Sequence, residues 1–360
     1  MDSKPKKIAV ICDYRLMPER IGGMDYFFWM FNQKCYENNI QVDWFFPNAT
    51  RHNGYEEFVL FSAENNNLEH FFYEYCRANK PVYTHVITHF LEICIPIFKK
   101  IKQVTQAKII VIDHNPRPLG GYPLNIKIKK YLKGLLYSKY IDLFVGVSDY
   151  SKNELIKDFG QQLKTKAVTI FNGLEIKKFK RKEDFELKYK FMVASHLRLE
   201  KGIQDLIQAV QELVKDKKLV FSIDIYGSGY YQAELEKMIQ DYSLENYFNF
   251  KGSVTNLHEI YCQYDYLIHP SQGETFCYSV VEGLLCNLPV ITNNQGNVLG
   301  FIKDTENGFL YKDGQIQQLK EILVRIVNKE IKIENGLIKR PEVAQLSLET
   351  MVNNHFNLLS

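Results

Sequence analysis

The chain has 360 residues, of which 46% are hydrophobic and 24% are charged. This balance is typical of a globular protein, and the length fits two domains better than one. The formal net charge of +3 is too small to indicate nucleic acid as the main partner. After a polar, basic start at residues 1–7, the apolar run from Ile8 to Cys12 is too short for a signal peptide and is predicted to be a strand. No run approaches the about 20 apolar residues of a transmembrane helix.

The seven cysteines are odd in number and scattered, and no two of them have the C-x-x-C spacing. Without a secretory signal, they are expected to be reduced thiols of a cytoplasmic protein. No group of cysteines and histidines has the spacing of zinc ligands, so we predict no metal site.

Short β-rich runs alternate with helical patterns along the chain, which is typical of parallel βαβ units. Many of these runs are apolar throughout, as expected for strands that are covered on both faces. The predicted strands are residues 8–13, 42–47, 85–90, 108–114, 143–148, 168–172, 191–195, 219–226, 248–251, 266–270 and 289–292. We therefore predict an α/β fold of two Rossmann-like domains.

The first domain is predicted over residues 1–175 and the second over residues 176–342. The charged segment 175–190 is interpreted as the linker between them. A final helical stretch, residues 343–360, follows a break at Pro341 and is expected to pack back on the first domain.

Two of the intervening helices are predicted with particular detail. One has its apolar residues at the i, i+3, i+4 and i+7 spacing of a helix with one buried face. These residues are Ile203, Leu206, Ile207, Val210, Leu213 and Val214. In the other, Ser151 and Glu154 are predicted to form the N-terminal capping box, and Gly160 to end the helix.

The segment most informative about function is residues 269–294, which read HPSQGETFCYSVVEGLLCNLPVITNN. The pattern predicts a strand, a polar turn, a helix from about Cys277 to Cys286 and a following strand. Ligands of open α/β sheets bind at the carboxyl ends of strands, and a helix N-terminus there offers free amides to a phosphate. Glu274 lies beside this position and Glu282 lies within the helix, where a carboxylate can accept two hydrogen bonds from a ribose diol.

Two glutamates eight residues apart are by themselves a weak signal, since both could be ordinary surface charges. The rest of the helix is apolar, however, and an idle charge on a buried helix is costly. The segment resembles the E-x7-E signature of the retaining family 4 glycosyltransferases, which have the GT-B fold of two Rossmann-like domains facing each other across a cleft. The matching residues are Pro270, Ser271, Glu274, Phe276, Glu282, Pro289, Val290 and Ile291. It departs from that signature at Cys277, Gly283 and Asn287.

Further landmarks of this family follow in the family's order along nearly the whole chain. Arg198 and Lys201 lie in LRLEKG, which resembles the family's R-x-x-x-K-G loop. Two such cations can neutralise the charge that develops on a leaving diphosphate. His196 stands where the family has glycine. Gly227, in YGSG, resembles the family's glycine turn near the nucleotide.

Ser253 and Val254 resemble the turn beside the base, and Phe276 and Cys277 complete the implied donor-binding set. In the first domain, Gly22 and Gly23 resemble the family's glycine-rich loop at the donor diphosphate, although an ordinary turn would explain them as well. His114, at the end of a predicted strand, resembles the family histidine that contacts the sugar.

The resemblance implies transfer of a hexose from a UDP- or GDP-sugar to a hydroxyl, with retention at the anomeric carbon. Glu274, Lys201, Arg198 and His114 would then be the catalytic residues. Neither a metal ion nor a cofactor is expected, because the cations and the helix N-terminus stabilise the diphosphate. Two alternatives remain open: another enzyme of this fold, such as a sugar-nucleotide epimerase, or a catalytically idle binding subunit.

Residues 125–140 give the best indication of a partner. Their pattern predicts a helix with an apolar stripe and several lysines, which can lie on an anionic membrane surface. The alternative is a surface helix whose apolar face lies in the core. Because lipid-linked acceptors are common in the family, the resemblance implies an acceptor that is lipid-linked or part of a surface polysaccharide. It also implies a cytoplasmic protein that can lie at the inner face of the membrane.

Overall fold

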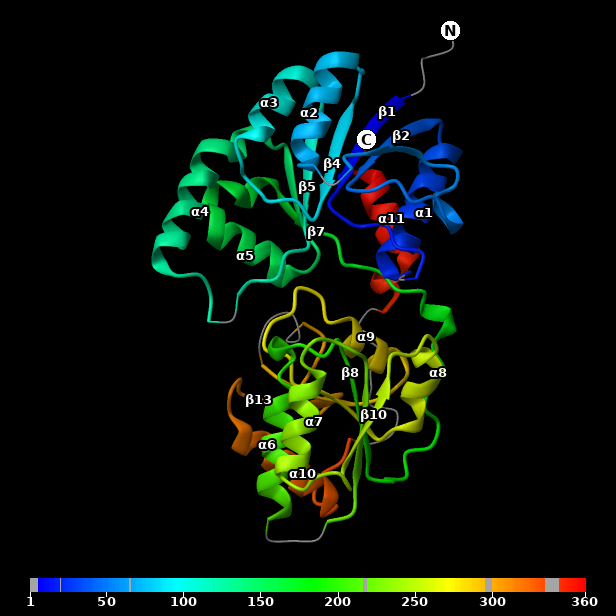
Figure 1. The fold of residues 1–360 in the computed structure, drawn as a ribbon, viewed down its shortest axis with the longest axis vertical. Helices are drawn as coiled ribbons and strands as arrows, with labels where there is room; N and C mark the ends of the chain where they lie inside the picture. The colour runs from blue at the N-terminus through cyan, green and yellow to red at the C-terminus, as the bar shows by residue number, and fades with distance from the viewer. Residues whose placement is uncertain are drawn as a thin grey trace. The chain divides into compact units, whose positions relative to one another are not determined.

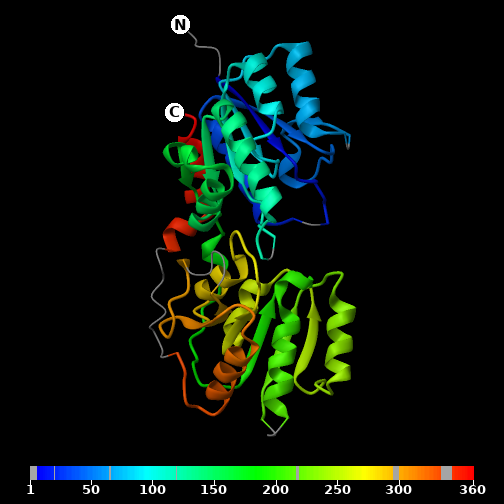
Figure 2. The same cartoon turned by 90° about the vertical axis from the view of Figure 1, so that its left-hand side faces the viewer.

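The computed structural model of the chain describes residues 6–19, 21–64, 66–118, 120–215, 219–294, 300–333 and 343–360. The chain forms two compact units. Unit 1 comprises Met1–Asn115, Gly121–Glu175 and Ala344–Ser360, and unit 2 comprises Pro116–Gly120 and Ile176–Val343. Each unit contains one parallel sheet with helices packed against it (Figures 1 and 2). Two Rossmann-like units are therefore present, as predicted.

The sheet of unit 1 has seven strands in the order β3-β2-β1-β4-β5-β6-β7. Its strands are β1 (Lys6–Cys12), β2 (Ile40–Phe46), β3 (Val59–Ser62), β4 (His85–His89), β5 (Lys108–Asp113), β6 (Leu143–Gly146) and β7 (Ala167–Thr169). The longer helices are α1 (Gly23–Glu37), α2 (Leu68–Asn79), α3 (Ile97–Thr105), α4 (Leu124–Tyr137), α5 (Asp149–Phe159) and α11 (Leu348–Asn357).

The alternation of side chains along β2 explains how both faces of this sheet are covered. Phe45 points into a core that α2, α3 and α5 complete, while Trp44 and Phe46 pack against Phe28 of α1. Successive side chains of a strand point to opposite faces, so an all-apolar strand is buried on both. The C-terminal helix α11 lies beside α1 (Figure 1), where His355 packs on the ring of Phe27 at 4.7 Å between centroids.

The sheet of unit 2 has six strands in the order β10-β9-β8-β11-β12-β13. They are β8 (Lys190–Ala194), β9 (Ser222–Tyr226), β10 (Phe248–Gly252), β11 (Tyr266–His269), β12 (Val290–Asn293) and β13 (Gly308–Tyr311). The helices are α6 (Ile203–Val214), α7 (Gln232–Asp241), α8 (Leu257–Ile260), α9 (Tyr278–Leu285) and α10 (Ile316–Val327). In this order, β9 lies on one side of β8 and β11 on the other, so the topology reverses between β8 and β11.

Four local predictions need correction. Strands β3 and β13 were not expected; each has four residues and lies at an edge of its sheet, where a short run leaves little pattern. The N-cap of α5 is Ser148, whose side chain accepts from the backbone N–H of Ser151. The capping box is therefore formed by Ser148 and Ser151, and not by Ser151 and Glu154. The segment 175–190 is more than a linker, because Lys182 is buried in unit 2 and donates to the carbonyl oxygen of Tyr264 at 2.6 Å.

Helix α4 turns its apolar stripe to solvent and not to the core. Its apolar side chains are exposed, and the interpretation that places them in the core is wrong. The exposed residues are Leu124, Ile128, Tyr131, Leu132, Leu135 and Leu136. Lys130 instead points inward, with its Nζ 3.4 Å from Asp158 and 4.7 Å from the ring centroid of Phe159.

The reason for this orientation is the glycine in the middle of α4. Gly134 is the buried residue of the helix, and a Cβ there would overlap the backbone carbonyl of Phe159 at the end of α5. Helices can approach this closely only where one of them has no side chain at the crossing.

We therefore expect Gly134→Ala to destabilise unit 1 by about 1–3 kcal/mol, the usual cost of overpacking a tight contact. Urea denaturation followed by circular dichroism measures this, with Lys129→Ala on the exposed face of α4 as the matched control. Equal midpoints for the two variants would show that α4 and α5 do not depend on this contact.

Candidate functional site

A cavity of about 390 Å³ lies at the carboxyl ends of the strands of unit 2. Residues after β8, β9, β10 and β11 all reach it, because parallel strands bring their carboxyl ends to one edge of the sheet. The lining includes Ser195, His196 and Lys201 after β8, Gly227 after β9, Ser253 and Val254 after β10, and His269, Glu274, Phe276, Ser279 and Glu282 from β11 through α9. The cavity thus lies at the β8–β11 reversal, where open α/β sheets bind ligands.

Gly227 is required where β9 meets β8. Its φ of +130° is one that residues with a side chain rarely adopt, and a Cβ there would overlap the carbonyl oxygen of Ser195. The two turns can approach this closely because glycine has no side chain at the contact. The next turn is tied to the same place, because the hydroxyls of Ser228 and Ser253 lie 2.9 Å apart.

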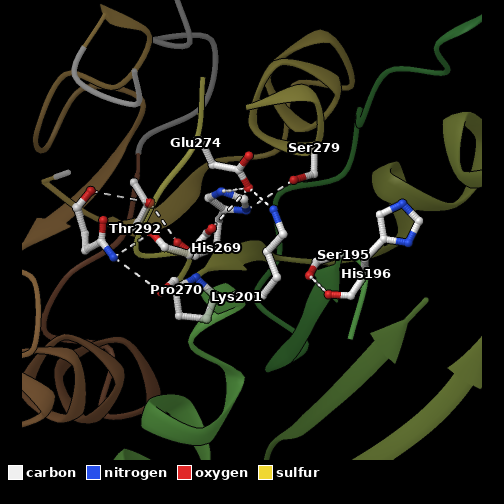
Figure 3. Close-up of polar contacts among 10 residues, drawn as sticks. Ser195, His196, Lys201, His269, Pro270, Glu274, Ser279 and Thr292 are labelled. Atoms are coloured by element: carbon white, nitrogen blue, oxygen red, sulfur yellow. Dashed lines mark hydrogen bonds and ion pairs between the residues drawn. The ribbon is translucent and has the colours of Figure 1, made fainter. Parts of the chain in front are cut away.

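The charged centre of the cavity is an ion pair between two of the predicted residues. Lys201 Nζ lies 2.5 Å from Glu274 Oε1, and the hydroxyl of Ser271 donates to the same oxygen at 3.1 Å. Both charged side chains are 17% exposed, so the pair is shielded from water but open to a ligand. Figure 3 shows the two side chains meeting beside His269, while the ring of His196 lies apart from them.

His269 was part of the recognised segment but was not predicted to be a site residue. Its Nε2 lies 3.6 Å from Glu274 Oε1, and its Nδ1 is 3.2 Å from the hydroxyl of Ser279 (Figure 3). Burial lowers its pKa to about 4, so the imidazole is neutral near pH 7. A histidine that ends a strand of a parallel sheet is the signal that could have identified it.

Glu282 lies deeper in the cavity and has a different partner. The hydroxyl of Tyr261 donates to its Oε2 at 2.7 Å, and Tyr261 is fully buried. Burial raises the pKa of Glu282, opposed by this hydrogen bond and by the charge of Lys178. Tyr261 was missed as well, because its helical turn lies 21 residues before Glu282 and carries no motif.

Two further predicted residues of unit 2 lie outside the lining of this cavity. Arg198 is exposed on the loop after β8, where it precedes a short 3-10 helix, Leu199–Lys201. Cys277 is buried as the N-cap residue of α9, and burial raises the pKa of its thiol well above the usual value. It is therefore a protonated, unreactive thiol.

The remaining predicted residues, Gly22, Gly23 and His114, belong to unit 1. Gly22 is the N-cap residue of α1, and its amide donates to the side chain of Asp25 at 2.8 Å. His114 Nε2 lies 3.0 Å from Nδ1 of His89, and its ring stacks on Phe90 at 4.2 Å. Burial lowers the pKa of His114 to about 3, so this imidazole is also neutral near pH 7.

Comparison with known proteins identifies what unit 2 resembles. Residues 175–340 match the family model of the glycosyl transferases group 1. A poly(ribitol-phosphate) alpha-N-acetylglucosaminyltransferase of Staphylococcus aureus is 27% identical over 159 residues, which are 43% of this chain and 32% of that protein. The GtfA subunit of a UDP-N-acetylglucosamine–peptide N-acetylglucosaminyltransferase of Streptococcus pneumoniae is 33% identical over 175 residues, 47% of this chain and 34% of that protein. The match thus spans about a third of the length of these relatives.

Among solved structures, that of HepE from Anabaena with UDP and glucose resembles the chain over its whole length. The TM-score is 0.73 at 17% identity, and the match covers 98% of this chain and 99% of that one. At this identity the likeness establishes the fold rather than the function. The predicted GT-B class is confirmed.

The raised pKa of Glu282 has a consequence for stability. A carboxyl whose pKa is higher in the folded than in the unfolded state destabilises the fold when it is ionised. Its contribution to the free energy of unfolding therefore falls as the pH rises from the usual pKa of 4.5 towards the raised one. Glu282→Gln removes this cost and keeps an acceptor for Tyr261. We expect its melting temperature near pH 7.5 to exceed that of the wild type by about 2–4 °C, the response of a unit of this size to about 1 kcal/mol.

At pH 4 the difference should be small, because the carboxyl is mostly protonated in both states. Scanning calorimetry at the two pH values measures the effect, with the exposed Glu245→Gln as the control. A gain that is the same at both pH values would mean that the charge of Glu282 is not its source.

Proposed function

We propose that this chain, which belongs to the group 1 glycosyl transferases through its second unit, transfers a hexose from a UDP-sugar to a hydroxyl with retention. The observation that carries the proposal is the cavity at the β8–β11 reversal, which is lined by a Lys–Glu ion pair and by a second glutamate. UDP is favoured over GDP because the relative from Streptococcus pneumoniae is described as using UDP-N-acetylglucosamine and the Anabaena structure contains UDP.

The nucleoside is assigned to the Glu282 side of the cavity. Tyr261 holds one carboxylate oxygen of Glu282, which orients the other towards a ribose diol. The turn at Ser253 and Val254 and the turn at Gly227 line the same cavity as Glu282, and we assign the uracil and its ribose to them. A buried carboxylate that accepts two hydroxyl donors recovers much of its desolvation cost when the nucleotide binds.

The diphosphate and sugar are assigned to Lys201 and Glu274. Without a donor, the two side chains neutralise each other. A diphosphate at the N-terminus of α9 would draw the ammonium of Lys201 towards its oxygens and free Glu274 to accept hydroxyls of the sugar. Neutral His269 would support this exchange, since its uncharged ring neither competes for the phosphate nor repels Lys201.

Catalysis would then follow from charge stabilisation of the leaving group. Breaking the anomeric C–O bond places negative charge on UDP, and Lys201 together with the α9 amides stabilises that charge more than the ground state. The acceptor hydroxyl attacks from the same face, which gives retention, and its proton passes to the departing phosphate oxygen. Arg198, His114, Gly22 and Gly23 are proposed to complete the donor site when a substrate is present.

We expect Lys201→Ala to lower turnover at least about tenfold, a barrier increase of about 1.4 kcal/mol or more. Glu282→Ala should lower kcat/KM by a similar factor, mainly through a higher KM for the donor. UDP release from a panel of UDP- and GDP-sugars, followed by chromatography, measures both and also identifies the donor. Lys237→Ala on exposed α7 is the control, and near-normal kinetics in both site variants would remove the donor-site assignment.

The acceptor is proposed to be a lipid-linked or growing surface glycan, met at an anionic membrane. Among the described helices, none is both long and apolar enough to cross a bilayer. Helix α4 instead offers a surface. Six of its large apolar side chains are between 48% and 73% exposed, and such a contiguous patch marks an interaction site more often than a chance arrangement.

The charges of α4 favour an anionic bilayer over a second copy of the chain. The helix reads LNIKIKKYLKGLLY and contains no acidic residue. Lys130 and Lys133 form ion pairs with Asp158 and Glu92, but Lys127 and Lys129 are exposed beside the leucines. Two copies related by twofold symmetry would bring these lysines together, whereas anionic lipids would attract them by about 1 kcal/mol each.

We expect Leu132→Ser with Leu135→Ser to abolish flotation with phosphatidylglycerol vesicles while UDP binding is unchanged. The matched control is Val82→Ser, which alters a side chain that is 83% exposed elsewhere in unit 1. The wild type should not bind phosphatidylcholine vesicles, and the double variant Lys127→Ala with Lys129→Ala should not bind phosphatidylglycerol vesicles. Flotation of the double leucine variant at the level of the wild type would exclude α4 as the membrane surface.

A further inference from the structure

Unit 1 contains a second and larger cavity that the proposed transfer reaction does not use. Its volume is about 660 Å³, within the range of small-molecule sites. The walls come from three segments that are distant in sequence: α1, the turn 53–58 between β2 and β3, and α11. All three belong to unit 1, so the cavity is complete within that unit.

The floor of this cavity is aromatic and apolar. Trp29 and Met30 contribute from α1, Phe58 from the turn and Val352 from α11. The indole of Trp29 is fixed edge-to-face against Tyr55, with ring centroids 5.6 Å apart. A rigid indole of this kind offers a preorganised contact surface to a ligand. Its Nε1 is buried and has no hydrogen-bond acceptor among the described residues.

The rim is made of groups that bind hydroxyls. Side-chain amides project from α1, from the turn and from α11, and Asn353 is the one from α11. Four carboxylates surround the opening, those of Glu37, Glu56, Glu57 and Glu349. Over the ranges that the structure describes, none of these four takes part in an ion pair, and the one cation of the lining, Lys34, lies over the ring of Phe356 at 5.7 Å.

We propose that this cavity binds an uncharged saccharide. A sugar ring has an apolar C–H face, which fits the floor of Trp29 and Phe58, and an edge of hydroxyls. Carboxylates accept from hydroxyls, and amides both donate and accept, so the rim can satisfy a hydroxyl edge from several sides.

The charge of the rim excludes other classes of ligand. Four carboxylates against one ammonium repel nucleotides, phosphorylated glycans and anionic lipids. The donor therefore belongs to unit 2, and this cavity suits a neutral part of the acceptor glycan. In this respect the inference rests on the proposed function: a glycosyl transferase that holds a growing glycan at a second point retains it between transfers.

The two tryptophans of the chain, Trp29 and Trp44, make the inference directly testable. Trp44 is fully buried and unit 2 contains no tryptophan, so a ligand at this cavity is expected to act on the emission of Trp29. We expect maltotriose or N,N′-diacetylchitobiose to shift the tryptophan emission of the full chain saturably, with a Kd of about 1 mM or below. Trigalacturonate, an anionic trisaccharide, should produce no shift.

Two neighbouring residues of α11 provide the matched variants. Asn353 lines the cavity, whereas Asn354 is exposed beside it and does not. Asn353→Ala should weaken saccharide binding about fivefold, the loss expected for one hydrogen bond, and Asn354→Ala should leave it unchanged. Equal affinities of the two variants, equal binding of trigalacturonate, or no saturable shift with either neutral sugar would overturn the proposal.

Titration calorimetry with UDP on the same preparation separates this proposal from the first. Binding of UDP without a saccharide response would refute the cavity assignment alone, and a saccharide response without UDP binding would refute the donor site alone. Light scattering provides the last test. A dimer whose dissociation accounts for the emission change would assign the cavity to self-association instead.

Discussion

The adjacency of β8 and β11 is the constraint on which the candidate site depends. Lys201 follows β8 and Glu274 follows β11, 73 residues later, yet the pairing of the two strands brings Lys201 Nζ and Glu274 Oε1 to 2.5 Å. The direction of the strands matters as much as their adjacency, because only parallel strands bring both following loops to one edge. The same edge receives the Gly227 and Ser253 turns, so the whole cavity follows from the strand order.

Within this frame, the two glutamates are buried by different means. Glu274 is neutralised by the ammonium of Lys201, which in the proposed function moves to the phosphates of the donor and leaves the carboxylate to the sugar. Among the residues that the structure describes, Glu282 forms no ion pair, and the hydroxyl of Tyr261 donates to it. Burial raises its pKa more than this hydrogen bond lowers it. A partly satisfied buried carboxylate costs stability without its ligand. One carboxylate is therefore balanced by a cation, and the other carries a desolvation cost that one hydrogen bond offsets only in part. In the proposed function, the first holds the sugar phosphate and the second the nucleoside.

Most of the fold could be predicted from the sequence because its strands are apolar throughout and its helices have one apolar face. The residues that the sequence placed well are those whose role is local, such as Gly160 at the end of α5 or Ile203 on the buried face of α6. Prediction failed where a contact between distant segments decides the outcome. The hydrogen bond between Tyr261 and Glu282, the inward turn of Lys130 and the burial of Lys182 all arise from tertiary packing, which no local pattern contains.

Helix α4 shows most clearly why pattern alone was insufficient, since its amphipathic sequence fits either orientation equally well. Gly134 decides between them, because the crossing with α5 must occur at the residue without a side chain. This places Lys130 inward and the leucines outward. The orientation also gives unit 1 two chemically different sides. Phe45 and Trp44 point to opposite faces of the sheet. The face of Phe45 is covered by α5, on which α4 packs, and the face of Trp44 is covered by α1, on which α11 packs. If α4 rests on anionic lipid, the cavity of α1 and α11 lies on the opposite face of the sheet from that lipid. Its four carboxylates would repel anionic lipid but not an uncharged glycan chain.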